Sequence, residues 1–198
     1  MTKLDLAKTD SQYYKATKKP QVVELGSYSY LQIIGKGATD GEFFHQAIGA
    51  IYELAFTLKF TFKEQNQDFV VPKLEAFWWV ESGLPFNETP QSEWQWKICM
   101  RMPDFVNAAS VSAAINSADH SKNAALASVF FSELNEGKCL QAMHTGPYSE
   151  QGQTNELITN FATENGLTIT GVHHEIYISD PRRTKPDNLK TIIRYSVA

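Results

Sequence analysis

Apolar and polar positions in the first half of the chain alternate between strand-like and helix-like spacing. From Tyr28 to Ile34 the side chains alternate between two faces, which is typical of a strand. Apolar residues then recur at helical spacing up to Leu58, behind Thr39 and Glu42, which have the spacing of a helix capping box. We therefore expect a helix over about residues 41–58, followed by strands within residues 70–80 and 94–102.

The second half repeats this order. An alanine-rich segment over residues 106–131 predicts one or two helices, and residues 138–144 predict a strand. Ser149 is a suitable N-cap for another helix, and Gly166 is a suitable C′ residue at its end. Residues 171–179 and 190–197 predict the last two strands. The shared order of strand, helix, strand and strand indicates an internal duplication of about 100 residues.

These elements predict an α+β fold of two βαββ units, with antiparallel sheets that carry helices on one face. A pseudo-twofold axis between the units would place a central ligand cleft there. We expect a single domain over residues 21–198, with halves at about 21–104 and 105–198. Residues 1–20 contain five lysines and no periodic apolar pattern, so we interpret them as an N-terminal arm that is solvated or forms a peripheral turn.

Two glutamates occupy matching places in the repeated order. Glu75 and Glu175 each lie in mid-strand and are followed at period two by aromatic residues, Phe77 and Trp79 in one half and Tyr177 in the other. A carboxylate among apolar neighbours is costly unless it is paired, hydrogen-bonded or exposed in a pocket. The pattern therefore predicts that both glutamates point into one aromatic-lined concavity.

The opposite faces of these two strands are apolar and should pack against the helices. They carry Leu74, Ala76, Trp78 and Val80 in one half and Val172, Ile176 and Ile178 in the other. A solvent-facing position, or an ion pair with Arg101 or Arg194, is a structural alternative for the glutamates. The functional interpretation is a carboxylate at the floor of an aromatic site, which suits a flat, apolar or cationic small molecule.

The overall composition excludes several functional classes. Among 198 residues, 18 Lys and Arg against 22 Asp and Glu give a net charge of −4, which disfavours a nucleic-acid partner. No apolar run approaches the roughly 18 residues of a membrane span, and the N-terminus has no apolar signal segment, so we expect no membrane partner and a cytoplasmic location. Cys99 and Cys139 lie in apolar runs and are expected to be buried thiols.

Other polar residues carry weaker signals. His173 and His174 are adjacent, so in a strand they point to opposite faces and cannot share a metal ion, and we expect no metal site. His144 precedes a Thr-Gly-Pro-Tyr turn and is expected to donate to a loop carbonyl. Asp180 is expected to stabilise a turn through its side chain. The sequence has no glycine-rich nucleotide motif and no serine-nucleophile motif, so we expect no cofactor.

Three segments of the second half together form a specific set. They are His144–Tyr148 (HTGPY), Glu175–Tyr177 (EIY) and the turn from Asp180 through Pro186 to Thr191. With YLQIIGKG and KLEAFWWV in the first half, the chain resembles the GyrI-like small-molecule-binding family, and within it the stand-alone bacterial subgroup, over residues 20–198. The resemblance implies two βαββ units around a pseudo-twofold axis. It also implies that Glu175 corresponds to the glutamate at the bottom of the aromatic, cation-binding pocket of multidrug-sensing regulators in this family.

The resemblance also implies a reaction, because some stand-alone members hydrolyse the strained cyclopropane of DNA-alkylating natural products. Glu175 would protonate or polarise the leaving dienone oxygen while Glu75 orients water, or the reverse, and Tyr177 or Tyr148 would relay a proton. Such opposed roles need opposed protonation states of the two carboxylates. The residues expected to bind the flat substrate are Phe77, Trp79, Trp94, Trp96, Tyr148 and Tyr30.

Two other functions fit the same residues. A drug-sequestering or ligand-sensing module would use the same site without chemistry and would need just one carboxylate. A protein that shields a DNA topoisomerase, suggested by the founding member of the family, would act through its surface instead. The charge and the internal repeat are compatible with a monomer or a small homo-oligomer.

Overall fold

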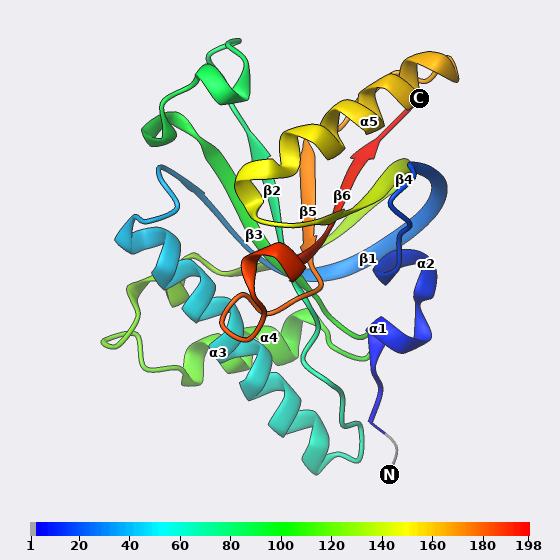
Figure 1. Cartoon of the computed structure of the whole chain (residues 1–198). Helices are drawn as coiled ribbons and strands as arrows, with labels where there is room; N and C mark the ends of the chain where they lie inside the picture. The colour runs from blue at the N-terminus through cyan, green and yellow to red at the C-terminus, as the bar shows by residue number, and fades with distance from the viewer. Residues whose placement is uncertain (1–2) are drawn as a thin grey trace. The chain divides into compact units, whose positions relative to one another are not determined.

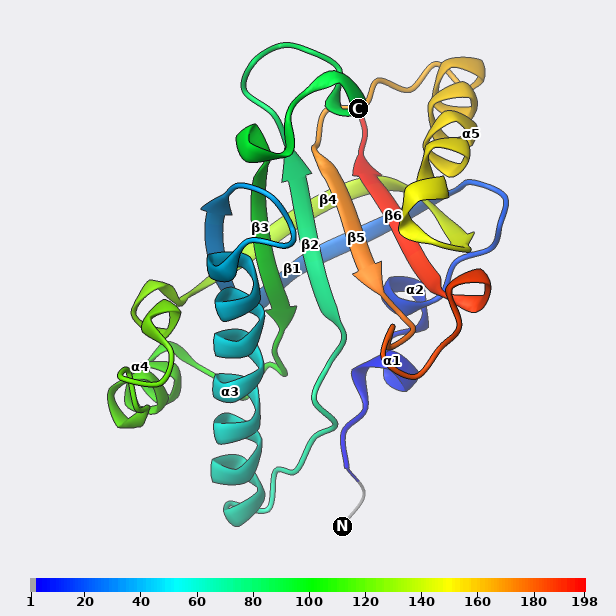
Figure 2. The ribbon, with the colours of Figure 1, turned by 60° about the vertical axis from the view of Figure 1, so that its left-hand side comes forward.

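The computed structural model describes residues 3–198, whose helices and strands are drawn in Figures 1 and 2. These residues form two compact units. The first unit contains residues 3–9 and 28–134, and the second contains residues 10–27 and 135–198. Each unit combines helices with three antiparallel strands, so the predicted mixture of helices and antiparallel sheet is confirmed. Within residues 3–198, no helix combines the length and the hydrophobicity that crossing a membrane requires.

The sheet of the first unit has its last strand in the middle. Strand β3 (Gln95–Arg101) pairs antiparallel with β1 (Gln21–Lys36), whose residues from Tyr28 onward belong to this unit, and with β2 (Leu74–Trp79). The loop between β2 and β3 contains two short 3-10 turns, η1 (Phe86–Glu88) and η2 (Gln91–Glu93). The three strands expected in the first half are therefore present, and β1 is longer than its alternating pattern indicated.

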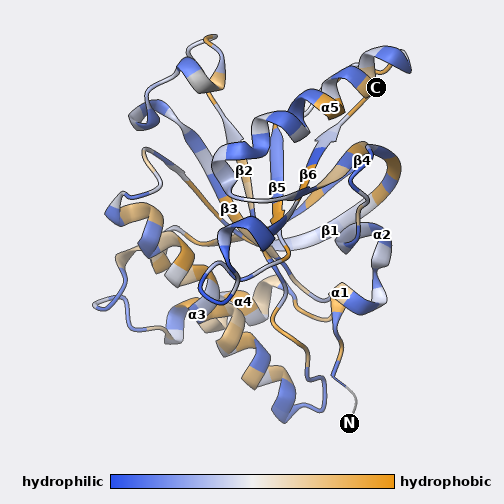
Figure 3. Ribbon diagram, viewed as in Figure 1, coloured by the Kyte–Doolittle hydropathy of each residue, from blue (hydrophilic) through white to orange (hydrophobic). Residues whose placement is uncertain are grey.

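Helix α3 (Glu42–Glu64) is longer than expected and begins differently. Its N-cap is Gly41, and no side chain caps it, so the capping box predicted from Thr39 and Glu42 is wrong. The helix continues beyond Leu58 because Phe62, one turn further on, is buried against Phe105 with ring centroids 5.1 Å apart. Figure 3 shows that α3 is much more hydrophobic than α5.

Aromatic packing fixes α3 on one face of its sheet. The ring of Phe44 lies 5.2 Å from that of Trp96 and 5.7 Å from that of Trp78. Gly35 faces Trp96 across the strands, and a Cβ atom at Gly35 would lie 2.2 Å from the indole ring, so the close approach requires glycine. Trp78 therefore lies on the helix-covered face, as predicted.

The segment after β3 forms helix α4 (Ala108–Ser117) and the 3-10 helix η3 (Ala124–Ser128), which confirms the expected one or two helices. The side chain of Asn107 accepts from the backbone amide of Ser110, and the hydroxyl of Ser110 accepts from the backbone amide of Asn107. This reciprocal capping satisfies two of the unpaired amides that every helix start leaves.

The second unit has the same order and the same central last strand. Strand β6 (Lys190–Ser196) pairs antiparallel with β4 (Phe130–Thr145), whose residues from Asn135 belong to this unit, and with β5 (His173–Tyr177). Helix α5 (Gln151–Glu164) follows the 3-10 turn η4 (Tyr148–Glu150), and η5 (Pro186–Asn188) precedes β6. The expected strands of the second half are present.

Of the two predicted ends of α5, only the C-terminal one is confirmed. Glu150 is the N-cap and makes no side-chain cap bond, so the prediction of Ser149 is wrong, because η4 takes up the residues after Pro147. At the other end Gly166 has a φ of 65°, and the Leu167 amide donates to the Ala162 carbonyl over 2.9 Å. This is the closing bond of a Schellman motif, which confirms Gly166 as the C′ residue.

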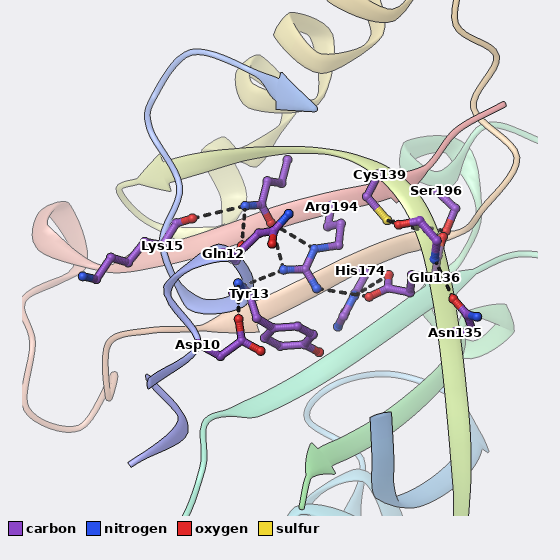
Figure 4. A network of polar contacts seen from close by, with 12 residues as sticks. Asp10, Gln12, Tyr13, Lys15, Asn135, Glu136, Cys139, His174, Arg194 and Ser196 are labelled. Atoms are coloured by element: carbon purple, nitrogen blue, oxygen red, sulfur yellow. Dashed lines mark hydrogen bonds and ion pairs between the residues drawn. The ribbon is translucent and has the colours of Figure 1, made fainter. Parts of the chain in front are cut away.

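The N-terminal residues, expected as a solvated arm or a peripheral turn, form two short helices, α1 (Leu6–Thr9) and α2 (Ser11–Tyr14). In the second unit, Tyr13 is fully buried beneath the guanidinium of Arg194, 4.3 Å from the ring centroid (Figure 4). The side chain of Gln141 donates to the carbonyls of Gln12 and Lys15. Side chains of β4 and β6 therefore hold α2 in place.

Candidate functional site

Glu75 lies on the face of the first sheet that points away from α3. It is fully buried and stands opposite Cys99, which in turn stands opposite Gln32. Side chains opposite each other on antiparallel strands share a face. The amide of Gln32 donates to the hydroxyl of Ser132 over 2.6 Å, so this face carries a row of small and polar groups around the carboxylate.

Three of the predicted aromatic residues share this face with Glu75. Phe77 is buried, and the ammonium of Lys97 lies 4.2 Å from its ring centroid. Trp79 is half-buried, and Tyr30 reaches the same face through its pairing with Arg101. The first unit therefore brings Tyr30, Glu75, Phe77 and Trp79 to one side of its sheet.

Trp94 and Trp96 lie on the other side. Trp96 is fully buried and stands opposite Trp78, in the layer that packs against α3. The ring of Trp94 lies 4.3 Å from that of Phe86, and its indole N–H donates to the carbonyl of Thr89 over 3.0 Å. The structure thus separates both tryptophans from the face of Glu75.

Glu175 lies on the helix-covered face of its sheet, whereas Glu75 lies on the face of its own sheet that points away from the helix. Glu175 stands opposite Ile193, which belongs to the core that Leu140, Ala142, Ile158 and Ala162 form beneath α5. Glu175 therefore lies on the helix-covered face and Ile176 on the other, so the prediction that Ile176 packs against the helix is wrong. The expected equivalence of Glu75 and Glu175 is wrong for the same reason, because a shift of one residue moves a strand side chain to the other face.

A chain of polar groups holds Glu175 on the α5 side. Nε2 of His173 lies 2.8 Å from Oε1 of Glu175, and Nδ1 of His173 lies 2.6 Å from the hydroxyl of Tyr195. The Tyr195 hydroxyl lies 3.3 Å from Oδ1 of Asn155 on α5. Burial, and secondly the negative charge of Glu175, raise the pKa of Tyr195, so its hydroxyl keeps its proton.

Tyr177 and Tyr148 lie next to one another on the same side of the second unit. Tyr177 shares the face of Glu175 two residues earlier, and its ring lies 5.7 Å from that of Tyr148, edge to face. Tyr148 is 41% exposed. A half-buried ring beside an exposed one gives a flat molecule a surface on which to stack.

The HTGPY turn positions Tyr148. His144 is buried, and its Nε2 lies 3.1 Å from the carbonyl of Pro147, which confirms the expected bond to a loop carbonyl. Its Nδ1 lies 3.0 Å from the hydroxyl of Thr154 on α5. His144 therefore ties the turn to the helix, a role in structure rather than in chemistry.

A second polar network occupies the opposite face of the second sheet (Figure 4). Glu136 accepts from Nδ1 of His174 over 2.9 Å and from Arg194 over 3.1 Å. Burial raises the pKa of Glu136, but the charges and hydrogen bonds of His174 and Arg194 outweigh it and lower the pKa to about 2. Arg194 therefore pairs with Glu136, and His173 and His174 point to opposite faces as expected.

Sequence reasoning missed His173 as the partner of Glu175. The spacing carries the signal, because residues i and i+2 of a strand share a face, and His173 and Glu175 are two residues apart. Asp180 accepts from the backbone amide of Arg182, which confirms the predicted turn. Both cysteines are free and buried, as predicted.

Within the described part of the chain, the residues named above form no metal centre, and they do not line the surface pocket of the first unit. Within residues 3–198, no group of three or more His, Cys, Asp or Glu side chains is arranged to hold a metal ion. A surface pocket of about 420 Å³ in the first unit is lined by residues around Asp68 and Phe105, and by none of the predicted site residues.

The class of domain and its family follow from a comparison of the sequence with known families. Residues 18–197 match the GyrI-like small molecule binding domain, so the chain belongs to the GyrI-like family. An uncharacterized conserved protein from Listeria innocua is 34% identical, with a TM-score of 0.91 over 99% of this chain and 100% of its own. A hydrolase from Listeria innocua is 33% identical, with a TM-score of 0.87 over the same shares.

A more distant likeness concerns the fold alone. The C-terminal domain of EcmrR is 12% identical and has a TM-score of 0.60 over 91% of this chain and 97% of that domain. No curated protein matches the sequence.

Proposed function

We propose that this protein hydrolyses a small, flat genotoxin that contains a strained cyclopropane, and so detoxifies it. The observation that supports hydrolysis is the 33% identity, over essentially the whole chain, to a hydrolase from Listeria innocua. The substrate class follows from the resemblance of the HTGPY and EIY segments to stand-alone GyrI-like proteins. Proton transfer would centre on Glu175, which the His173 contact orients on the α5 face.

The reaction needs one proton acceptor and one proton donor. A water molecule gives a proton to the acceptor while its oxygen forms a bond to a cyclopropane carbon. The strained carbon–carbon bond breaks, and its electron pair moves through the dienone to the carbonyl oxygen. That oxygen takes a proton from the donor, so the product is a ring-opened alcohol with a phenol, and the sum adds one water. Glu175 takes one of these roles, and Tyr177, on the same face of the second unit, takes the other.

In this proposal, the sheet face on which an aromatic residue lies decides whether it contacts the ligand. Tyr148 and Tyr177 of the second unit stack on the ligand beside Glu175. Tyr30, Phe77 and Trp79 share the face of Glu75 in the first unit. Trp94 and Trp96 are left out, because they pack on the α3 side of the first sheet.

The common order of elements and the central last strand in both units support an origin by duplication.

The test follows the ultraviolet absorption of a cyclopropane-containing dienone alkylator mixed with the protein. Wild type is expected to remove the dienone band catalytically, and Glu175→Gln is expected to leave it while still binding, as shown by tryptophan fluorescence. Glu156→Gln is the matched control, because Glu156 is exposed on α5 and the same atoms change there. A stable dienone band with wild type would overturn the hydrolase proposal.

A second candidate is a binding protein without chemistry. It is favoured by the family's small-molecule-binding domain and by the fold shared with the EcmrR C-terminal domain. Such a protein would sequester or sense flat cations, for which ring faces and one carboxylate suffice. Quenched tryptophan fluorescence together with an unchanged dienone band would support this candidate.

A further inference from the structure

The hydrogen bonds around His173 run in a definite direction. The hydroxyl of Tyr195 has one proton to donate, either to Nδ1 of His173 at 2.6 Å or to Oδ1 of Asn155 at 3.3 Å. The contact with His173 is the shorter of the two and therefore the stronger hydrogen bond. A phenol keeps its proton at neutral pH, and burial raises the pKa of Tyr195 further, so the hydroxyl stays protonated and remains a donor. Nδ1 of His173 then accepts, and the ring proton belongs on Nε2.

A proton on Nε2 sets the direction of the contact with Glu175. Nε2 lies 2.8 Å from Oε1 of Glu175, so an N–H there donates to the glutamate, and this bond is strongest when Glu175 accepts as a carboxylate. If the ring carried both protons, Nδ1 would donate to Tyr195, Tyr195 would donate to Asn155, and Glu175 would again accept. A Glu175 that instead donates to Nε2 requires the single ring proton to sit on Nδ1.

The residues around His173 and Glu175 offer few competing partners for the hydrogen bond from His173 to Glu175. The side chains of His173 and Glu175 are 15% and 10% exposed, so bulk water offers few competing partners. Arg194, the nearest alternative cation on β6, points to the other face and pairs with Glu136. Among residues 3–198, His173 is the hydrogen-bond partner of Glu175 and uses Oε1, which leaves Oε2 to accept from a ligand or a water molecule.

From this geometry we infer that His173 is a positioning residue that holds Glu175 as the proton acceptor of the reaction, with the Tyr195 hydroxyl fixing the orientation of the imidazole. The inference rests on the proposed hydrolysis for its catalytic consequence. It assigns Glu175 one of the two roles that the sequence left open, that of taking the proton of the attacking water. The proton for the dienone oxygen then comes from another group, Tyr177.

Two replacements of His173 separate positioning from mere packing. His173→Gln keeps an N–H donor near the place of Nε2, and His173→Phe keeps a planar ring without a donor. We expect His173→Phe to lower kcat for dienone hydrolysis about 100-fold with little change in KM, since general-base catalysis contributes on that scale. His173→Gln should retain kcat within about tenfold of wild type. His45→Gln, on the exposed side of α3, is the control.

Thermal unfolding of both variants shows whether the fold is kept, and equal losses of kcat in the two variants would overturn the inference. A long-range ¹H–¹⁵N NMR spectrum of wild type tests the geometry without any turnover. A proton on Nε2 of His173, with or without one on Nδ1, supports the inference, and a proton on Nδ1 alone overturns it. If wild type does not consume the dienone, the proposed hydrolysis fails and His173 has no catalytic role, whereas the spectrum still decides whether Glu175 is held as an acceptor.

Discussion

Glu175 stands directly opposite Ile193 across strands β5 and β6, and Ile193 lies in the core beneath α5. This pairing places a carboxylate on the helix-covered side of the second sheet, where an apolar residue would be the simpler choice. The desolvation of Glu175 is offset by the hydrogen bond from His173. A polar group kept in an apolar layer together with its own chain of partners is typical of a functional site.

Glu175 and Tyr177 should both matter for turnover. Glu175→Gln is expected to reduce dienone hydrolysis at least 100-fold, because an amide cannot accept the proton of the attacking water. Tyr177→Phe should have a comparable effect only if Tyr177 is the acid. Single-turnover kinetics of both variants check this, and a fully active Glu175→Gln protein would remove the carboxylate from the mechanism.

Tyr195→Phe removes the hydroxyl that orients His173. We expect kcat to fall less than in His173→Phe, because the bond between His173 and Glu175 remains. Loss of one hydrogen bond should lower the free energy of unfolding by about 1 kcal/mol. Urea unfolding and steady-state kinetics measure the two effects, and a wild-type kcat would show that Tyr195 does not orient the imidazole.

Trp96 should matter for stability and not for ligand binding. It is fully buried against Phe44, so Trp96→Ala is expected to cost about 3–5 kcal/mol of unfolding free energy. Trp79→Ala is the comparison, because Trp79 is half-buried on the face of Glu75 and should cost less. Denaturant titrations with and without ligand test this, and a ligand affinity that depends on Trp96 would contradict it.

The buried ion pair of Glu136 predicts acid sensitivity. The folded state lowers the pKa of Glu136 from 4.5 to about 2, so this group stabilises the fold fully above about pH 4.5 and loses that effect as the pH falls toward 2. The contribution is about 3 kcal/mol, at 1.4 kcal/mol per pKa unit. Glu136→Gln should therefore be less stable than wild type at pH 6, with the difference shrinking by pH 3. Unfolding free energies at the two pH values would decide.

The thiols should react only when the protein opens. Burial, and secondly the charge of Glu136, raise the pKa of Cys139 to about 12, so little thiolate forms near neutral pH. Cys99 is also fully buried. A thiol-specific reagent at pH 8 is expected to modify neither residue in the native protein and both in denaturant. Rapid labelling of Cys139 under native conditions would contradict this prediction.

The succession of strands and helices and several local details follow from the order of residues alone. Gly166 ends α5 because only a residue that tolerates positive φ closes the Schellman motif cheaply. His144 bonds the Pro147 carbonyl because the two lie three residues apart in a tight turn. Such interactions are local in the chain, so their partners can be found by spacing alone.

The tertiary structure decided which face of each strand a helix covers, and with it the surroundings of both glutamates. Strand periodicity defines two faces but does not say which one is covered when both are buried, as they are along β5 with Ile176 and Glu175. The partners of Arg194 show the same limit, since the carbonyl of Tyr13 lies 181 positions away in the sequence. Long-range pairing depends on how all elements pack at once, and no local pattern of residues contains that information.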